Sequence, residues 1–222
     1  GAYTFVPNAD AESFTETFTY TIKDSDGTLS NTTVAITVSD GVTVTVPGAE
    51  DDGTTVLEAG LPAGTGELSD NIPNNDNSET TSGTITFTAS DTPVTISVGG
   101  QPVVIAGVDQ TDLTVDGAFG VLTLDLTNVA TGSIGYSYTL DANIDHDDAV
   151  ADSDTFAVVV TDEDGDSANG SLVIAITDDG PEAVADSQTI NASATEATGN
   201  VLTNDVAGAD DEVLDLLGGQ QL

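Results

Sequence analysis

The chain has 222 residues, of which 39 are Asp or Glu, and Lys23 is its only Lys or Arg, so the formal net charge is −38. Without a basic patch to neutralise phosphates, nucleic acid is excluded as a partner. The absence of Cys excludes disulfides and thiol chemistry, and no apolar run approaches the roughly 20 residues that span a bilayer. With 38% hydrophobic residues the chain can still bury a core.

Apolar and polar residues alternate with a period of two along most of the chain, and Asp-Gly pairs separate the runs. We expect Tyr136 and Tyr138 to pack inward from one strand face, and a helix only at 211–217. Many short strands with polar turns predict an all-β fold, a β-sandwich. The expected strands are 17–22, 33–38, 42–46, 83–88, 94–98, 102–105, 112–115, 120–126, 133–140, 155–161 and 171–177.

An acidic hairpin occurs twice, 138 residues apart. Asp24-Ser-Asp26-Gly aligns with Asp162-Glu-Asp164-Gly, and each copy lies between two apolar strands. Such a hairpin suits the end of a domain, so the repeat predicts two domain ends. We therefore expect three segments in a piece of a longer protein. They are the C-terminal part of a sandwich repeat (1–41), a complete sandwich domain (42–180) and the N-terminal part of the next repeat (181–222).

Several motifs resemble a known family. The stretch 156–181, with Thr-Asp-Glu-Asp-Gly-Asp and then Ile-Ala-Ile-Thr-Asp-Asp-Gly-Pro, resembles the repeats of giant type I-secreted bacterial adhesins of the RTX class. The motif Val-Leu-Glu-Ala-Gly-Leu-Pro at 56–62 is similar to the opening of those repeats. The terminal segments resemble the Vibrio–Colwellia–Bradyrhizobium–Shewanella (VCBS) repeat of such proteins, with Ala-Val-Ala-Asp at 183–186 leading to Gly-Asn-Val-Leu-Thr-Asn-Asp at 199–205. The long-repeat region of pseudomonad biofilm adhesins is the best match.

The resemblance implies extracellular, Ig-like or cadherin-like domains joined end to end, with Ca²⁺ at loops and linkers. It implies a non-enzymatic spacer that serves attachment and biofilm formation at the bacterial cell surface. The expected partners are neighbouring tandem domains of the same chain and calcium ions, and the isolated fragment is expected to be monomeric. The glycine-rich calcium-binding nonapeptide of this family is absent, so no β-roll is expected.

Clustered acids indicate where Ca²⁺ would bind, because this hard cation takes six to eight oxygen ligands. Alternating acids at a tight turn, or in a linker beside Pro, place several carboxylates together. An ordinary hairpin turn or a solvated linker is the alternative at each place. The candidate ligands are acids of the hairpins, linkers and loops, namely Asp24, Asp26, Asp40, Glu58, Asp145, Asp147, Asp154, Asp162, Asp164, Asp166, Asp178, Asp179 and Glu182.

Other chemistry has less support in the sequence. His146 is the only histidine and is expected to be a loop residue, because a zinc site would ordinarily draw on further His or Cys ligands. No nucleophile elbow, phosphate-binding loop or tuned acid–base pair is present, so we expect no enzyme. Two alternatives remain: a module that binds a carbohydrate or surface directly, and an acidic domain without a specific metal.

Overall fold

In the computed structural model, the described residues are 1–8, 11–49, 51–68, 76–110, 113–144, 146 and 152–210. They form a nearly all-β structure with three very short helical turns, η1 (Glu58–Gly60), α1 (Thr65–Leu68) and η2 (Val129–Thr131). The strands are β1 (Phe14–Lys23), β2 (Leu29–Val38), β3 (Val42–Thr45), β4 (Thr55–Leu57), β5 (Thr80–Ala89), β6 (Thr95–Val98), β7 (Gln101–Ile105), β8 (Val108–Asp109), β9 (Thr114–Asp116), β10 (Gly120–Asp125), β11 (Ser133–Leu140), β12 (Ser153–Thr161) and β13 (Ser167–Thr177).

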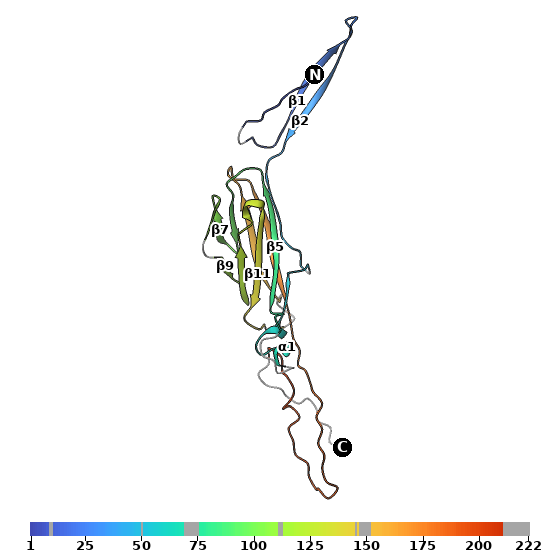
Figure 1. Cartoon of the computed structure of the whole chain (residues 1–222), viewed down its shortest axis with the longest axis vertical. Helices are drawn as coiled ribbons and strands as arrows, with labels where there is room; N and C mark the ends of the chain where they lie inside the picture. Colours follow the sequence, from blue (N-terminus) through green and yellow to red (C-terminus); the bar gives the residue numbers. More distant parts are fainter. Residues whose placement is uncertain are drawn as a thin grey trace. The chain divides into compact units, whose positions relative to one another are not determined.

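The strands form three sheets (Figure 1). One is the β1–β2 ribbon, one has the order β3-β5-β11-β10-β9, and one has the order β4-β13-β12-β6-β7-β8. Neighbours pair antiparallel in β1–β2, β10–β11 and β12–β6, whereas β4 pairs parallel with β13. These sheets confirm the all-β sandwich class that the strand pattern predicts.

Side chains along most of the sandwich strands alternate between more and less buried positions, as the period of two requires. On β11, Ile134, Tyr136, Tyr138 and Leu140 are all buried. The inward packing predicted for the two tyrosines is therefore confirmed. The ring of Tyr138 lies edge-on to Phe156, with the ring centroids 6.1 Å apart. Each such buried side chain contributes about 1.5–3 kcal/mol.

The chain divides into two compact units. The first buries Val98, Val104 and Val158 among its core residues, and the second is centred on β10 and β11. The domain boundaries predicted after residues 41 and 180 stay predictions. Unit 1 comprises Gly1–Thr45, Thr86–Asp112 and Ala157–Gly170, and unit 2 comprises Val46–Ile85, Leu113–Phe156 and Ser171–Leu222.

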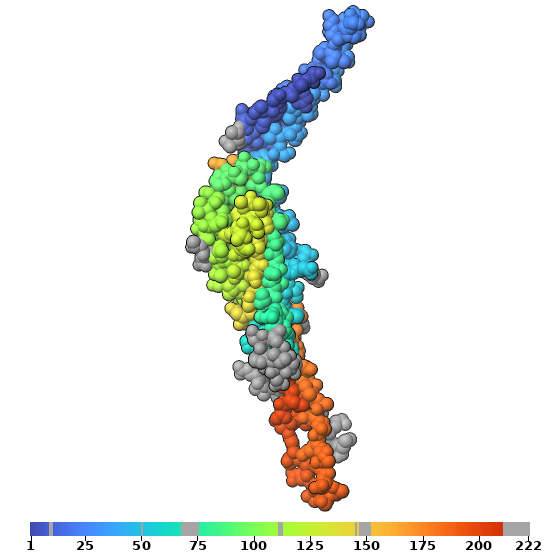
Figure 2. Space-filling model, viewed as in Figure 1, coloured from blue at the N-terminus to red at the C-terminus, as the bar shows by residue number. Residues whose placement is uncertain are grey.

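In the β1–β2 ribbon, all ten residues of β1 are exposed. The space-filling view shows its side chains at the surface, in blue (Figure 2). Phe5 packs against Phe14 and Phe18, with ring centroids 6.2 and 6.0 Å apart. The partial repeat predicted at 1–41 stays a prediction.

Strand β4 is an element that the sequence pattern did not predict, since three residues are too few to show a period. It pairs with the end of β13 through Thr55 opposite Ala175 and Val56 opposite Ile176. Val56 is fully buried. This short strand leads directly into η1 and so fixes the position of Glu58. The helix predicted at 211–217 lies outside the described residues.

Candidate metal centres

The turn between β12 and β13 gathers three of the predicted acids. The amide of Asp162 donates to the carbonyl of Asp166 at 3.0 Å, and the amide of Asp166 donates to Oδ1 of Asp164 at 3.4 Å. Gly165 closes the turn with φ at 109°, in the region that favours glycine. Within this turn, one carboxylate oxygen from each of Asp162, Asp164 and Asp166 lies within 4.8 Å of the others.

Three more acids reach this turn from elsewhere in unit 1. Asp40 and Asp91 form a group of close carboxylates with Asp162, and Glu12 forms another with Asp40 and Asp166. A backbone hydrogen bond joins the segments that carry Asp40 and Asp91: the amide of Ser90 donates to the carbonyl of Gly41 at 3.2 Å. We call the six acids the hairpin cluster: Glu12, Asp40, Asp91, Asp162, Asp164 and Asp166.

Asp162 is the most constrained member of the hairpin cluster. It is only 6% exposed, and neither of its carboxylate oxygens has a hydrogen-bond partner. Oδ2 of Asp40 is likewise buried without a partner. Burial, and then the neighbouring carboxylate of Asp164, raise the pKa of Asp162. A buried carboxylate without a partner is costly unless a cation or a proton neutralises it. The chain has one Lys or Arg in total, so its own basic residues offer little compensation.

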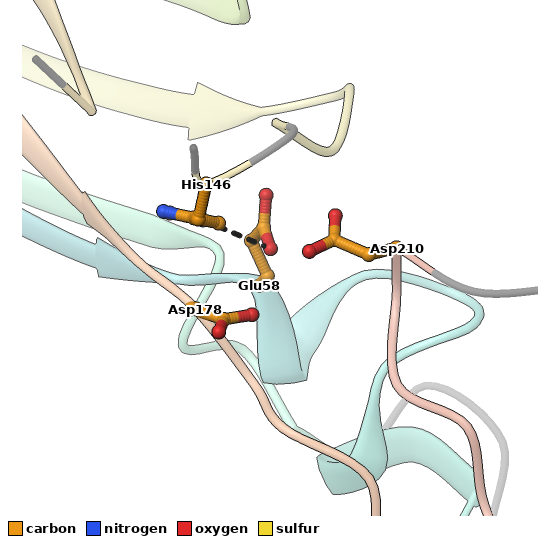
Figure 3. A group of neighbouring side chains, drawn as sticks. All are labelled: Glu58, His146, Asp178 and Asp210. Carbon is orange, nitrogen blue, oxygen red and sulfur yellow. Dashed lines mark ion pairs between the residues drawn. The ribbon is translucent and has the colours of Figure 1, made fainter. Parts of the chain in front are cut away.

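A second group in unit 2 combines a histidine with three carboxylates. Glu58, His146, Asp178 and Asp210 each place one ligand atom within 4.8 Å of the others. Figure 3 shows the four side chains converging from four separate segments, with the carboxylate of Glu58 between His146 and Asp210. Glu58 opens η1, and Asp178 directly follows β13. We call these four residues the histidine cluster.

Close polar contacts orient Glu58, which is buried, and His146, which is partly exposed. Glu58 is fully buried, and its Oε1 accepts the amide of Ile144 at 2.6 Å. Its Oε2 lies 3.3 Å from Nε2 of His146. Nδ1 of the same ring lies 2.9 Å from Oδ2 of Asp152. By geometry, neither Glu58 Oε2 nor His146 Nε2 makes a hydrogen bond.

The pKa values follow from this arrangement. Burial raises the pKa of Glu58 despite the amide bond from Ile144. Burial works against the charged form of His146, but the hydrogen bond to Asp152 and the charge of Glu58 outweigh it and raise the pKa of His146. Burial also raises the pKa of Asp210. All three groups therefore hold a proton more readily than usual.

Two of the predicted ligands have protein donors on both oxygens. Asp154 accepts the amides of Ala118 at 2.7 Å and Phe119 at 3.1 Å, and the Tyr138 hydroxyl donates to it at 2.7 Å. This buried carboxylate therefore ties a loop to the core. Asp179 accepts the amides of Thr65 at 2.6 Å and Ala209 at 2.9 Å. Both residues have a structural role in the described part of the chain.

Among the described residues, Asp24, Asp26 and Glu182 belong to neither cluster. Oδ1 of Asp24 accepts the amides of Asp26, Gly27 and Thr28 at 3.2, 3.0 and 2.9 Å, so this carboxylate closes the β1–β2 turn. Glu182 takes part in an isolated bridge to Val206 through its backbone. Asp145 and Asp147 lie outside the described residues. The two copies of the acidic hairpin thus differ, since among the described residues only the second gathers acids from other loops.

Sequence reasoning missed Glu12, Asp91, Asp152 and Asp210, and it read His146 as a loop residue. Glu12, Asp91 and Asp210 join their clusters through contacts between segments that are far apart in the chain, and Asp152 contacts His146 of the histidine cluster. The sequence carries one usable signal, which is that Asp91 and Asp210 fall just after apolar runs, as the recognised ligands Asp40 and Asp178 do.

Both clusters are groups of acidic residues that could hold a metal ion. Among the described residues, no helix is long and apolar enough to cross a membrane. Comparison of the chain with protein-family models, with curated proteins and with solved structures finds no match.

Proposed function

We propose that this chain is a non-enzymatic, Ca²⁺-stabilised extender module of a secreted bacterial adhesin, acting at the cell surface in attachment and biofilm formation. The observation that carries the proposal is the hairpin cluster, in which every ligand atom is a carboxylate oxygen. Ca²⁺ takes six to eight oxygen ligands at flexible geometry, a set that six carboxylates and nearby carbonyls can supply. Buried Asp162 favours a cation at this place, because neither of its oxygens has another partner.

The mechanism follows from where the six acids lie in the chain. Glu12 precedes β1, Asp40 follows β2, Asp91 follows β5, and the turn acids join β12 to β13. A cation bound here would link four segments that are distant in sequence. Without it, the carboxylates repel one another at less than one Debye length, about 8 Å at physiological ionic strength. The bound ion would therefore stiffen this end of each repeat, which is what a spacer between tandem domains requires.

The calcium affinity expected of such a site suits an exported protein. Extracellular modules bind Ca²⁺ with Kd of about 10⁻⁴ to 10⁻³ M. A site of this affinity would be nearly empty at the micromolar Ca²⁺ inside a cell and filled outside. The chain would stay loose during export and become rigid afterwards.

Thermal unfolding of the purified chain in EDTA and in Ca²⁺, at constant ionic strength, tests the proposal. We expect about 2.7 kcal/mol of added stability at a Ca²⁺ concentration of 100 Kd. Mg²⁺ is the matched control, since it demands a smaller octahedral site and should stabilise less. A melting temperature that is the same in EDTA and Ca²⁺ would exclude the proposal and favour an acidic domain without a specific metal.

A ligand-binding module is the second candidate, and one observation favours it. The first residues and β1 line a hollow of about 570 Å³ that includes Tyr3, Phe5, Phe18 and Tyr20. Exposed aromatic rings of this kind stack on sugars. Binding of the chain to a glycan array would favour the ligand module, and no binding would favour the extender.

A further inference from the structure

The histidine cluster differs from the hairpin cluster in its donor atoms. It offers one imidazole nitrogen with three carboxylates, whereas the hairpin cluster offers carboxylates alone. Imidazole suits borderline metals such as Zn²⁺, while Ca²⁺ takes oxygen ligands. Four protein ligands are also the number of a closed, structural zinc site, and they are fewer than Ca²⁺ takes.

We propose that Glu58, His146, Asp178 and Asp210 form a Zn²⁺ site that is separate from the Ca²⁺ site of the hairpin cluster. The proposal does not depend on the extender function, because it rests on the geometry of His146 and Glu58. Its role would be structural, since all four ligand positions are filled by protein and none is left for a substrate.

The orientation of His146 supports a metal ligand. Its Nδ1 lies 2.9 Å from the carboxylate of Asp152, which holds the proton on that nitrogen and leaves the lone pair of Nε2 facing the cluster. A carboxylate that orients the far nitrogen of a ligating imidazole is the usual arrangement around zinc. Nε2 itself makes no hydrogen bond and lies 3.3 Å from Glu58 Oε2.

Glu58 is the second, independent observation. Its side chain is 0% exposed, and the amide of Ile144 occupies only Oε1. Oε2 is buried, has no hydrogen-bond partner and lies 3.3 Å from Nε2 of His146. A buried carboxylate oxygen in this state is costly unless a cation or a proton neutralises it, and a metal ion held by the four ligands would do so.

The four ligands come from four places in unit 2, namely η1, the segment after β11, the end of β13 and residue 210. A Zn²⁺ ion would join the end of the last strand to the segment that follows it. Asp178 also lies where the sequence predicts a linker to the next repeat. Zinc would therefore fix the course of the chain as it leaves the sheet.

Metal titration of the EDTA-treated full chain, in excess Ca²⁺, tests the proposal. We expect Zn²⁺ to bind one site that Ca²⁺ does not fill, and Co²⁺ at that site to give the visible absorption of a tetrahedral complex. His146→Gln should weaken Zn²⁺ binding by about 100-fold or more, and Asp152→Asn by about 10–100-fold. Asp162→Asn, in the hairpin cluster, is the matched control, and it should weaken Ca²⁺ binding while leaving Zn²⁺ binding unchanged.

The single histidine gives a readout that needs no variant. Because His146 is the only imidazole in the chain, its ¹⁵N signals are unambiguous, and Zn²⁺ should shift Nε2 while Nδ1 stays protonated. This holds even if a variant fails to fold. Equal Zn²⁺ affinity in wild type and His146→Gln, or an Nε2 signal unmoved by Zn²⁺, would overturn the zinc site. If the chain binds Zn²⁺ as expected but Ca²⁺ does not stabilise it, the zinc site stands and only the proposed extender function is refuted.

Discussion

Asp162→Asn should change the stability of the protein in opposite directions with and without Ca²⁺. The substitution keeps the shape of the side chain and removes its charge. In EDTA the charge of Asp162 is a burden, because it is buried within 4.8 Å of carboxylate oxygens of Asp40, Asp91, Asp164 and Asp166. Two unit charges at that distance repel by about 0.9 kcal/mol at the dielectric constant of water, and screening by salt roughly halves this. Relief of all four pairs should stabilise the metal-free variant by about 2 kcal/mol.

In Ca²⁺ the same charge is an advantage. Wild type should gain about 2.7 kcal/mol at 100 Kd. Loss of one ligand charge should weaken binding by about 100-fold, which would reduce the gain of the variant to about 0.4 kcal/mol at the same Ca²⁺ concentration. The variant should therefore be more stable than wild type in EDTA and less stable in Ca²⁺.

Urea unfolding followed by circular dichroism, at constant ionic strength, measures both differences. Asp125→Asn is the matched control, since Asp125 is exposed, lies outside both clusters and accepts only the amide of Thr127 at 3.0 Å. It should have the same effect in EDTA and Ca²⁺. The reasoning is refuted if Asp162→Asn is less stable than wild type in EDTA, or if Ca²⁺ stabilises both proteins equally.

Three further predictions concern the other acids. Asp154→Asn should lower the free energy of unfolding by about 1.5–3 kcal/mol, equally in EDTA and Ca²⁺, because Asp154 accepts hydrogen bonds within the core. A Ca²⁺-dependent loss in urea unfolding would show that it is a ligand. Asp24→Asn should leave calorimetric Ca²⁺ binding unchanged, because its oxygen already accepts turn amides, and any weaker binding would place calcium at the first hairpin. In EDTA, the folded-state pKa values of Glu58 and Asp162 lie above their ordinary 4.5 and 3.8. The stabilisation by the protonated side chains is therefore complete below these ordinary pKa values. It is lost as the pH rises through the higher pKa values of the folded state. The melting temperature in EDTA should therefore fall as the pH rises from 4 towards neutrality. Glu58→Gln should make this fall smaller. An equal fall in the variant and in wild type would contradict the raised pKa of Glu58.

The alternation of apolar and polar residues predicted most of the strands from local information. Alternation located the hairpin strands β12 and β13 and the inward face of β11, because burial on one sheet face requires a period of two. The Asp-Gly turn at 164–165 was also readable, since only its own few residues decide it. Strand β4 was not readable, because its three residues gain their conformation from pairing with the end of β13.

The sequence alone determined that acids gather at the hairpin turn and after each hairpin, so Asp162, Asp164 and Asp40 were predicted as ligands. Only the tertiary structure decided which acids share a site. Asp154 and Asp162 look alike in sequence. Both carboxylate oxygens of Asp154 accept hydrogen bonds, whereas neither oxygen of Asp162 does. Likewise, His146 is a lone loop histidine until folding brings it to Glu58. The physical reason is that a metal site depends on distances between segments far apart in the chain, and the strand period carries no information about these distances.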